Sequence, residues 1–334
     1  MKRVYRQWLR YRISAVACLI VFLMASSAAA LEKQPVEEPV LLRIGYLPIL
    51  SQLPLIFSFD RERFSYQKVQ VQLTGFNSLI ALEAAFRVKA IDIAYLPIPT
   101  ILAMKAEGIN VLMGDSLHSG GSSLVMRSRV KEKDGSGTVY GIPGLTSSEL
   151  LILYNSLGRA GFNYGDDYKV VVVQLDSTID ELEQGNIDGV FLPEPYPTIA
   201  SGQLPKKIQL SQLAVENAQT PQAALAFNRN IVSDRNKDGL LEWLGSIDRA
   251  CLFLEKDIRN FGGAQTVLTQ QHYFGFEPAL IRQAFDNMHI PLKFSAKKVL
   301  LSDLEGILET MISLKLLQKS VKVHEMLLDP DLLQ

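Results

Sequence analysis

One short segment combines hydroxyl, acidic and glycine residues at the spacing of a helix start. It spans residues 144–149, in which Thr146 and Glu149 stand three residues apart, as the members of a capping box do. A helix N-terminus presents free N–H groups and a partial positive charge, which suits an anionic or acceptor-rich ligand. Thr146, Ser147 and Ser148 are therefore candidate ligand-binding residues. The alternative is that their hydroxyls only cap the helix.

Glu194 is the next candidate, because its neighbours restrict it. Pro193 and Pro195 limit the backbone on both sides and could hold the carboxylate in a fixed direction. The carboxylate could then bind a cationic or donor group, and Tyr196 could add an aromatic wall. An equally simple interpretation makes Glu194 a structural hydrogen-bond partner for a hinge or a neighbouring loop.

Other residues that carry chemistry do not form recognisable sites. Residues 234–239 match the first half of a calcium loop, but the twelfth position is Gly245 instead of a bidentate acid, so a polar turn before a helix is the simpler interpretation. The histidines are His118, His272, His289 and His324, and they show no ligand spacing. The sequence contains no Walker loop, nucleophile elbow or HExxH pair. We therefore predict no catalytic residue, no metal and no cofactor.

The elements that would position these residues alternate between β-rich runs and helical patterns from Leu41 onward. This alternation is typical of parallel sheets with crossover helices, and several runs are continuously apolar, as fully buried strands should be. The predicted strands are residues 41–47, 68–74, 91–96, 109–113, 168–175 and 188–192. The predicted helices are residues 77–88, 147–157, 239–256, 263–273, 278–288 and 303–317, the last with Ser302 and Glu305 as a capping box.

Ligands of open α/β sheets bind beyond the carboxyl ends of strands, so the loops after the predicted strands are the candidate binding segments. They are residues 48–52, 76–78 and 97–100 in one half, and 144–148, 176–178 and 193–196 in the other. These loops add Gln52, Asn77, Ser78 and Pro97 to the candidate ligand-binding residues.

The first thirty residues differ in composition from the rest. Five basic residues precede an acid-free apolar run over residues 13–24 and an Ala28-Ala29-Ala30 exit, which together predict a secretory signal peptide over residues 1–30. The run is shorter than the ~20 apolar residues that a membrane span needs. A lipoprotein-like site ends at Cys18, but the apolar run continues past it, which argues against a lipid anchor. We therefore expect a periplasmic or other extracytoplasmic protein.

The remaining composition bounds the partners. The 334 residues are 48% hydrophobic and 21% charged, as in an ordinary globular protein of two domains or one large unit. Removal of residues 1–30 leaves 29 basic against 35 acidic residues, a net charge of −6, which does not favour a nucleic-acid partner. Cys251 would then be the single cysteine, so we expect no intrachain disulfide.

Four landmarks, in order along about 290 residues, resemble the nitrate/sulfonate/taurine-type substrate-binding proteins of ABC importers. Residues 43–55 (RIGYLPI followed by LPL) resemble their opening strand and helix, and residues 82–95 (LEAAF followed by IDIAY) resemble the next helix and strand. Residues 186–196 (NIDGVF followed by EPY) and 324–330 (HEMLLDP) resemble two later elements. The resemblance rests on the order of the landmarks, because each alone is short.

The resemblance implies a two-lobed type II periplasmic-binding-protein fold, an α/β architecture with a central ligand cleft and two crossing segments. Lobe I would comprise residues 41–126 and 229–334, and lobe II residues 127–228. It also implies a monomeric binding protein that captures a small molecule by lobe closure and passes it to ABC importer permease subunits. The cargo would be a nitrate-, sulfonate- or taurine-like anion or a small heterocycle. Relatives often carry an acidic or basic residue where this sequence has Gln52.

An enzyme on the same scaffold is the alternative, since relatives of this fold include a pyrimidine-precursor synthase and a chorismate dehydratase. The synthase would require a cysteine-rich iron motif, which the sequence lacks, and both enzymes would be expected inside the cell. A ligand-sensing module would need a recognisable signalling domain.

Overall fold

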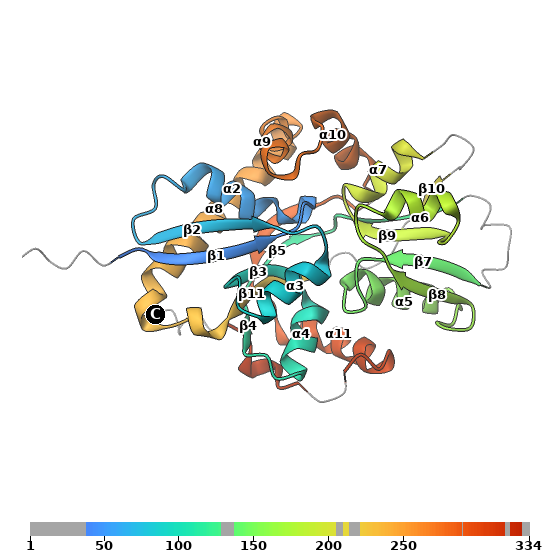
Figure 1. Cartoon of the computed structure of the whole chain (residues 1–334), viewed down its shortest axis with the longest axis horizontal. Coiled ribbons are helices and arrows are strands. Elements are labelled where there is room, and N and C mark those ends of the chain that lie inside the picture. The colour runs from blue at the N-terminus through green and yellow to red at the C-terminus, as the bar shows by residue number, and fades with distance from the viewer. Residues whose placement is uncertain are drawn as a thin grey trace, which may run out of the picture. The chain divides into compact units, whose positions relative to one another are not determined.

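The computed structural model describes residues 38–127, 137–204, 210–213, 221–288, 290–317 and 321–328. Residues from Pro39 onward form one compact unit (Figure 1). The predicted signal peptide and Cys18 lie outside the described residues, as does His289. Within the described ranges, no helix combines the length and apolar character that crossing a bilayer requires.

The first sheet has the strand order β2-β1-β3-β11-β4. Its strands are β1 (Val40–Tyr46), β2 (Val69–Gly75), β3 (Ile93–Pro97), β4 (Val111–Met113) and β11 (Ala223–Asn228). Strand β1 pairs in parallel with β2 and β3, whereas β11 is antiparallel to both β3 and β4.

Both faces of the central part of the first sheet are covered, which explains the continuously apolar sequence of β3. Ile93 and Tyr95 pack in one hydrophobic cluster with helices α2 (Leu53–Glu62) and α8 (Lys237–Phe261). Ala94 and Leu96 point to the opposite face, where they join the cluster that contains residues of α3 (Leu79–Arg87) and α4 (Ile98–Ala106).

The second sheet repeats this plan with the order β10-β6-β9-β7-β8. Its strands are β6 (Ser122–Arg127), β7 (Thr138–Ile142), β8 (Tyr168–Val172), β9 (Gly189–Pro193) and β10 (Leu210–Leu213). Strand β7 is parallel to β8 and β9, and β6 is antiparallel to β9 and β10. The associated helices are α5 (Ser148–Arg159), α6 (Thr178–Gln184) and α7 (Tyr196–Gln203).

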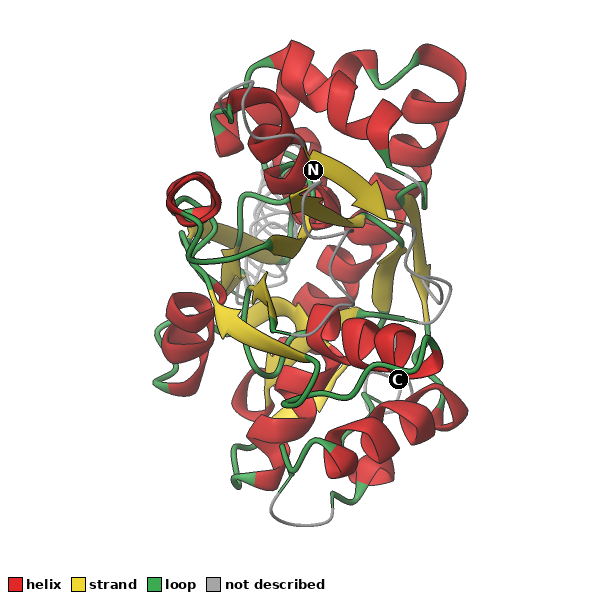
Figure 2. Ribbon diagram, turned by 90° about the vertical axis from the view of Figure 1, so that its right-hand side faces the viewer, coloured by secondary structure: helices red, strands yellow, loops and turns green. Residues whose placement is uncertain are grey.

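The remaining elements complete the unit. A two-stranded sheet joins β5 (Ser116–Ser119) to β12 (Lys293–Lys297), and the C-terminal helices are α9 (Ala264–Phe274), α10 (Pro278–Asn287) and α11 (Leu301–Ser313). Short 3-10 helices lie at Leu50–Gln52, Arg229–Ile231, Asp234–Asn236 and Val323–Glu325. Figure 2 shows the helices distributed around the strands.

The two sheets do not coincide with the predicted lobe boundaries. Strand β6 was assigned largely to lobe I, which ended at residue 126, yet it pairs with β9 in the second sheet. Strand β11 was assigned to lobe II, which ended at residue 228, yet it pairs with β3 and β4 in the first sheet. The chain enters the second sheet directly after Gly120 and Gly121, whose φ angles of +75° and +89° are left-handed and suit glycine.

Two predicted helix starts also differ in detail. The N-cap of α5 is Ser147 and not Thr146, because the Ser147 hydroxyl accepts a hydrogen bond from the backbone N–H of Leu150 (3.3 Å). Helix α11 begins at Leu301, and the Asp303 carboxylate accepts from the backbone N–H of Leu300 (3.0 Å) in place of the predicted Ser302 cap.

The calcium-like half loop forms a polar turn that opens α8. Residues Asp234–Asn236 are a 3-10 helix, and the Asn236 side-chain amide donates to the carbonyl of Ile231 (3.0 Å). Asp238, in the first turn of α8, forms an ion pair with Lys68. In the described parts of the chain, no group of three or more His, Cys, Asp or Glu side chains could hold a metal ion.

Candidate functional site

A small cavity, here called the inner pocket, lies where segments from both sheets meet. Its volume is about 50 Å³. The first sheet contributes Gln52, which follows β1, and Pro97, which ends β3, while the second contributes Ser148, which follows β7, and Pro193, which ends β9. The pocket thus lies at the carboxyl ends of parallel strands, where ligands of open α/β sheets bind.

Gln52 presents an unused hydrogen-bond acceptor in this pocket. The residue closes the 3-10 helix Leu50–Gln52 and is only 2% exposed. Its Nε2 donates to the carbonyl of Tyr95 (2.9 Å), but its buried Oε1 has no hydrogen-bond partner among the described residues. Buried polar atoms are normally paired, so an unpaired one at a pocket marks a place for a ligand donor.

Glu149 supplies the carboxylate of the inner pocket. It stands in the first turn of α5, is 6% exposed, and accepts a hydrogen bond from the Ser122 hydroxyl (2.9 Å). Burial raises the pKa of Glu149, while hydrogen bonds from its own backbone N–H and from Ser122 and Ser147 oppose that rise. A negative group in the first helical turn also compensates the helix dipole.

His118 and Tyr95 form a buried pair on the same wall. The Tyr95 hydroxyl and His118 Nδ1 are 2.7 Å apart, and the backbone N–H of Leu117 donates to that hydroxyl (2.8 Å). Burial lowers the pKa of His118 to about 4, so this imidazole is neutral at pH 7.

Three hydrogen bonds link the two sheets around the inner pocket. The Thr100 hydroxyl donates to the carbonyl of Thr146 (2.9 Å), and the backbone N–H of Leu50 donates to the carbonyl of Glu194 (2.8 Å). The Ser148 hydroxyl donates to the carbonyl of Gln222, the residue that precedes β11. The loops predicted from strand ends therefore do meet.

The Glu194 carboxylate is held by hydrogen bonds within the protein. Its side chain is fully buried, accepts from the Ser123 hydroxyl (2.6 Å) and lies 3.3 Å from the backbone N–H of Thr198. Burial raises its pKa. Tyr196 packs edge to face on Phe276, with 5.8 Å between ring centroids. Neither Glu194 nor Tyr196 lines the inner pocket.

Some of the other predicted site residues line the inner pocket, and the rest lie beside it. Gln52, Pro97 and Ser148 line the inner pocket. Ser78 is the N-cap of α3, whose next residue, Leu79, reaches the pocket, and Asn77 is exposed. Thr146 and Ser147 support the start of α5 without lining the pocket.

Sequence reasoning missed four polar residues of this wall. His118 and Ser122 belong to β5 and β6, two strands that the sequence patterns did not predict. Gln222 precedes the equally unpredicted β11. Glu149 was noticed only as a capping residue, although a carboxylate one turn into a helix at a strand end was a usable signal.

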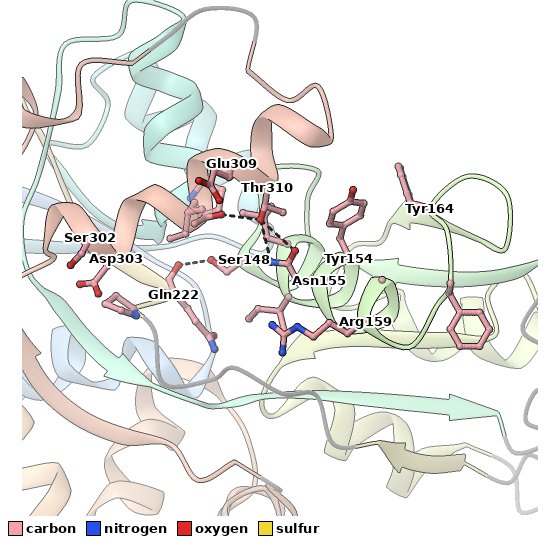
Figure 3. Close-up of a pocket in the computed structure, with 18 of the residues that line it drawn as sticks. Ser148, Tyr154, Asn155, Arg159, Tyr164, Gln222, Ser302, Asp303, Glu309 and Thr310 are labelled. Atoms are coloured by element: carbon pink, nitrogen blue, oxygen red, sulfur yellow. Dashed lines mark hydrogen bonds between the residues drawn. The ribbon is translucent and has the colours of Figure 1, made fainter.

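A larger cavity of about 710 Å³, here called the outer cavity, adjoins the inner pocket through Ser148 and Gln222, which line both. It lies between α5 and α11, where the Asn155 amide donates to the Thr310 hydroxyl (3.2 Å; Figure 3). Its lining is more strongly charged than that of the inner pocket, with Arg159 among its residues.

Comparison with solved structures identifies the fold. The ligand-binding component of an ABC-type import system from Staphylococcus aureus, with zinc bound, matches with a TM-score of 0.76 and 17% identity over 88% of this chain and 98% of that one. The nitrate-binding protein NrtA from Synechocystis matches with a TM-score of 0.73 and 14% identity over 88% of this chain and 87% of that one. The alkanesulfonate-binding protein SsuA from Xanthomonas axonopodis, bound to MOPS, matches with a TM-score of 0.72 and 16% identity over 87% of this chain and 99% of that one. The expected periplasmic-binding-protein fold is thus confirmed.

Sequence comparison places the chain in a family. No curated protein matches it. The model of the NMT1-like family matches residues 36–257, more than half of the chain, which agrees with the resemblance to nitrate- and sulfonate-type binding proteins. The chain belongs to the NMT1-like family.

Proposed function

We propose that the chain is the extracytoplasmic solute-binding component of an ABC importer. It captures a small molecule in the inner pocket by closure of two lobes, and it releases the molecule to membrane permease subunits. The observation that carries this proposal is the pocket itself, a cavity walled by strand ends of both sheets and lined by Gln52, whose buried Oε1 has no hydrogen-bond partner among the described residues. The ligand is bound without change to its bonds.

The proposed lobes follow the sheets. Residues 122–213 form lobe II, and the first sheet with the C-terminal helices forms lobe I. The cross-sheet hydrogen bonds of Thr100 and Leu50 support this division, because they can form only when the strand ends of the two lobes approach one another. Closure would then be a hinge movement of a monomer that the ligand favours by contacting both lobes.

The competing proposal is an enzyme on the same scaffold. The Tyr95–His118 pair favours it, because a histidine that lines a pocket is a common general base. Against it stands the pKa of His118, about 4, which makes the imidazole a weak base at neutral pH. We therefore give the pair a structural role and favour a carrier.

A thermal-shift screen followed by product analysis tests the proposal. The chain beginning at Leu31 is screened against small anions, sulfonates and nitrogen heterocycles, since a ligand at 100 times its Kd adds about 2.7 kcal/mol of stability. Each stabilising compound is then incubated with the protein and recovered for mass spectrometry. A compound that is recovered unchanged supports a carrier, whereas conversion of the compound to a product refutes the carrier function. A screen without any stabilising compound counts against a binding role.

N-terminal sequencing of the exported protein tests its location. We expect a terminus at or near Leu31, because the Ala28-Ala29-Ala30 exit follows a short apolar run. A lipidated Cys18 would make the protein membrane-anchored, and an intact Met1 on the functional protein would contradict export by cleavage.

A further inference from the structure

The inner pocket offers hydrogen-bond acceptors at two places where its side chains are fixed. One is Gln52 Oε1, whose amide is oriented by the 2.9 Å bond from Nε2 to the Tyr95 carbonyl. That bond orients the amide and leaves Oε1 without a hydrogen-bond partner among the described residues, so a ligand that reaches Oε1 and donates a hydrogen bond would satisfy it. A ligand that carries only acceptors leaves Oε1 unpaired.

The second acceptor is the Glu149 carboxylate, held by the Ser122 hydroxyl at 2.9 Å. Its position at the start of α5 makes the helix N-terminus less suited to binding an anion. The Ser147 hydroxyl already accepts from the N–H of Leu150, and the acidic side chain already lies in the positive end of the helix dipole. A second anion there would face a nearby carboxylate.

No cationic side chain offsets this carboxylate. Within the described residues, the lining of the inner pocket contains neither lysine nor arginine, and its histidine, His118, is neutral at pH 7. An anion taken from water into this pocket would lose its hydration without gaining a counter-charge, and such a transfer is strongly unfavourable.

We propose that the ligand of the inner pocket is a small uncharged or cationic molecule that donates hydrogen bonds, such as an amide, amine or amidine, and that Gln52 and Glu149 select it. This inference rests on the proposed binding function and removes anions from its candidate cargo. Gln52 accepts a hydrogen bond from a donor on the ligand, and Glu149 increases the affinity for a ligand that carries a positive charge.

Three probes of one shape test the proposal: acetate, acetamide and acetamidinium. All are planar and carry one methyl group, and at pH 7 they differ in charge and in the number of N–H donors. Saturation-transfer NMR on the methyl signal measures the binding of each to the chain that begins at Leu31. Wild-type protein should bind acetamide and acetamidinium, and acetate roughly tenfold or more weakly.

Two variants locate the binding. Gln52→Met keeps the side-chain length and removes the acceptor, so it should weaken acetamide and acetamidinium by about tenfold. Glu149→Gln is similar in shape to the protonated acid and should remove the preference for acetamidinium over acetamide. Glu309→Gln, in the outer cavity, is the control and should leave all three affinities unchanged. Thermal unfolding of each variant confirms that it folds.

Equal binding of the three probes, a preference for acetate, or binding of none overturns the inference. So does a loss that Glu309→Gln reproduces. An anion that binds and loses affinity with Gln52→Met would overturn the ligand class and leave the carrier function standing. The carrier function fails separately, when a stabilising compound from the broad screen is converted to product.

Discussion

His118 should make the folded protein less stable as the pH falls below 6.5. The residue is 7% exposed, and burial lowers its pKa from 6.5 to about 4. Between these values the unfolded chain binds a proton on His118 and the folded chain does not, so the free energy of unfolding decreases as the pH decreases. Linkage between the two pKa values gives a loss of ~2 kcal/mol at pH 5 relative to pH 8.

Urea unfolding of the wild type and of His118→Asn at pH 5, 6 and 8 measures this contribution. Asparagine keeps a polar atom near the position of Nδ1 and does not titrate. Burial raises the pKa values of Glu149 and Glu194, so their contribution to the free energy of unfolding decreases as the pH rises, opposite to that of His118. Both residues are present in the wild type and the variant, so their contributions cancel when the two proteins are compared. The wild type should lose ~2 kcal/mol more than the variant between pH 8 and pH 5. Parallel profiles would refute a buried, neutral His118.

Two further pairs of substitutions test the packing of the first sheet and the entry into the second. Trp243→Ala should destabilise the protein by about 3–5 kcal/mol, because the side chain is fully buried against Phe227, whereas Leu252→Ala on the same helix, at 72% exposure, should change stability by less than about 0.5 kcal/mol in chemical denaturation. Gly120→Ala should cost about 1–3 kcal/mol more than Gly108→Ala. Both glycines have left-handed φ angles, but an added Cβ meets the Pro291 carbonyl at 2.6 Å only at Gly120. Equal calorimetric melting temperatures for the two glycine variants would contradict that contact.

The long, strongly patterned elements were predictable from the sequence. The six predicted strands all exist, and β1 and β2 begin and end within one residue of the predicted bounds. Helix α8 extends beyond the predicted range 239–256 at both ends, to Lys237 directly after the polar turn at Asp234–Asn236 and to Phe261 before the left-handed Gly262. Burial of both faces gives central strands such as β3 and β9 a continuous apolar run, which one sequence can reveal.

The short antiparallel strands were not predictable in the same way. Strands β5 and β12 are four and five residues long, and β12 carries mixed exposure, so neither has a clear period. Their pairing joins segments that lie far apart in the chain, which no local pattern records. For the same reason the sequence could not show which sheet β6 and β11 join, because only their distant partner strands reveal it.

The site was predicted at the level of loops and not of side chains. Gln52 and Ser148 line the inner pocket because strand ends converge there. Glu194 and Ser147 are buried beside the pocket, where their hydrogen bonds hold the loops. A polar residue after a strand can either face the ligand or support the loop, and only side-chain direction separates these roles.

The central claim is that a ligand joins two lobes, and a distance between them tests it most directly. Spin labels at Phe64→Cys, after α2, and Glu183→Cys, in α6, report on the two lobes, and both positions are exposed. Cys251 is buried with a pKa raised to about 12, so it should not be labelled. With the strongest ligand of the screen, the Phe64–Glu183 distance should shorten by more than about 2 Å. A pair at Phe64 and Leu268, both in lobe I, should not change. An unchanged Phe64–Glu183 distance at saturating ligand would contradict the claim.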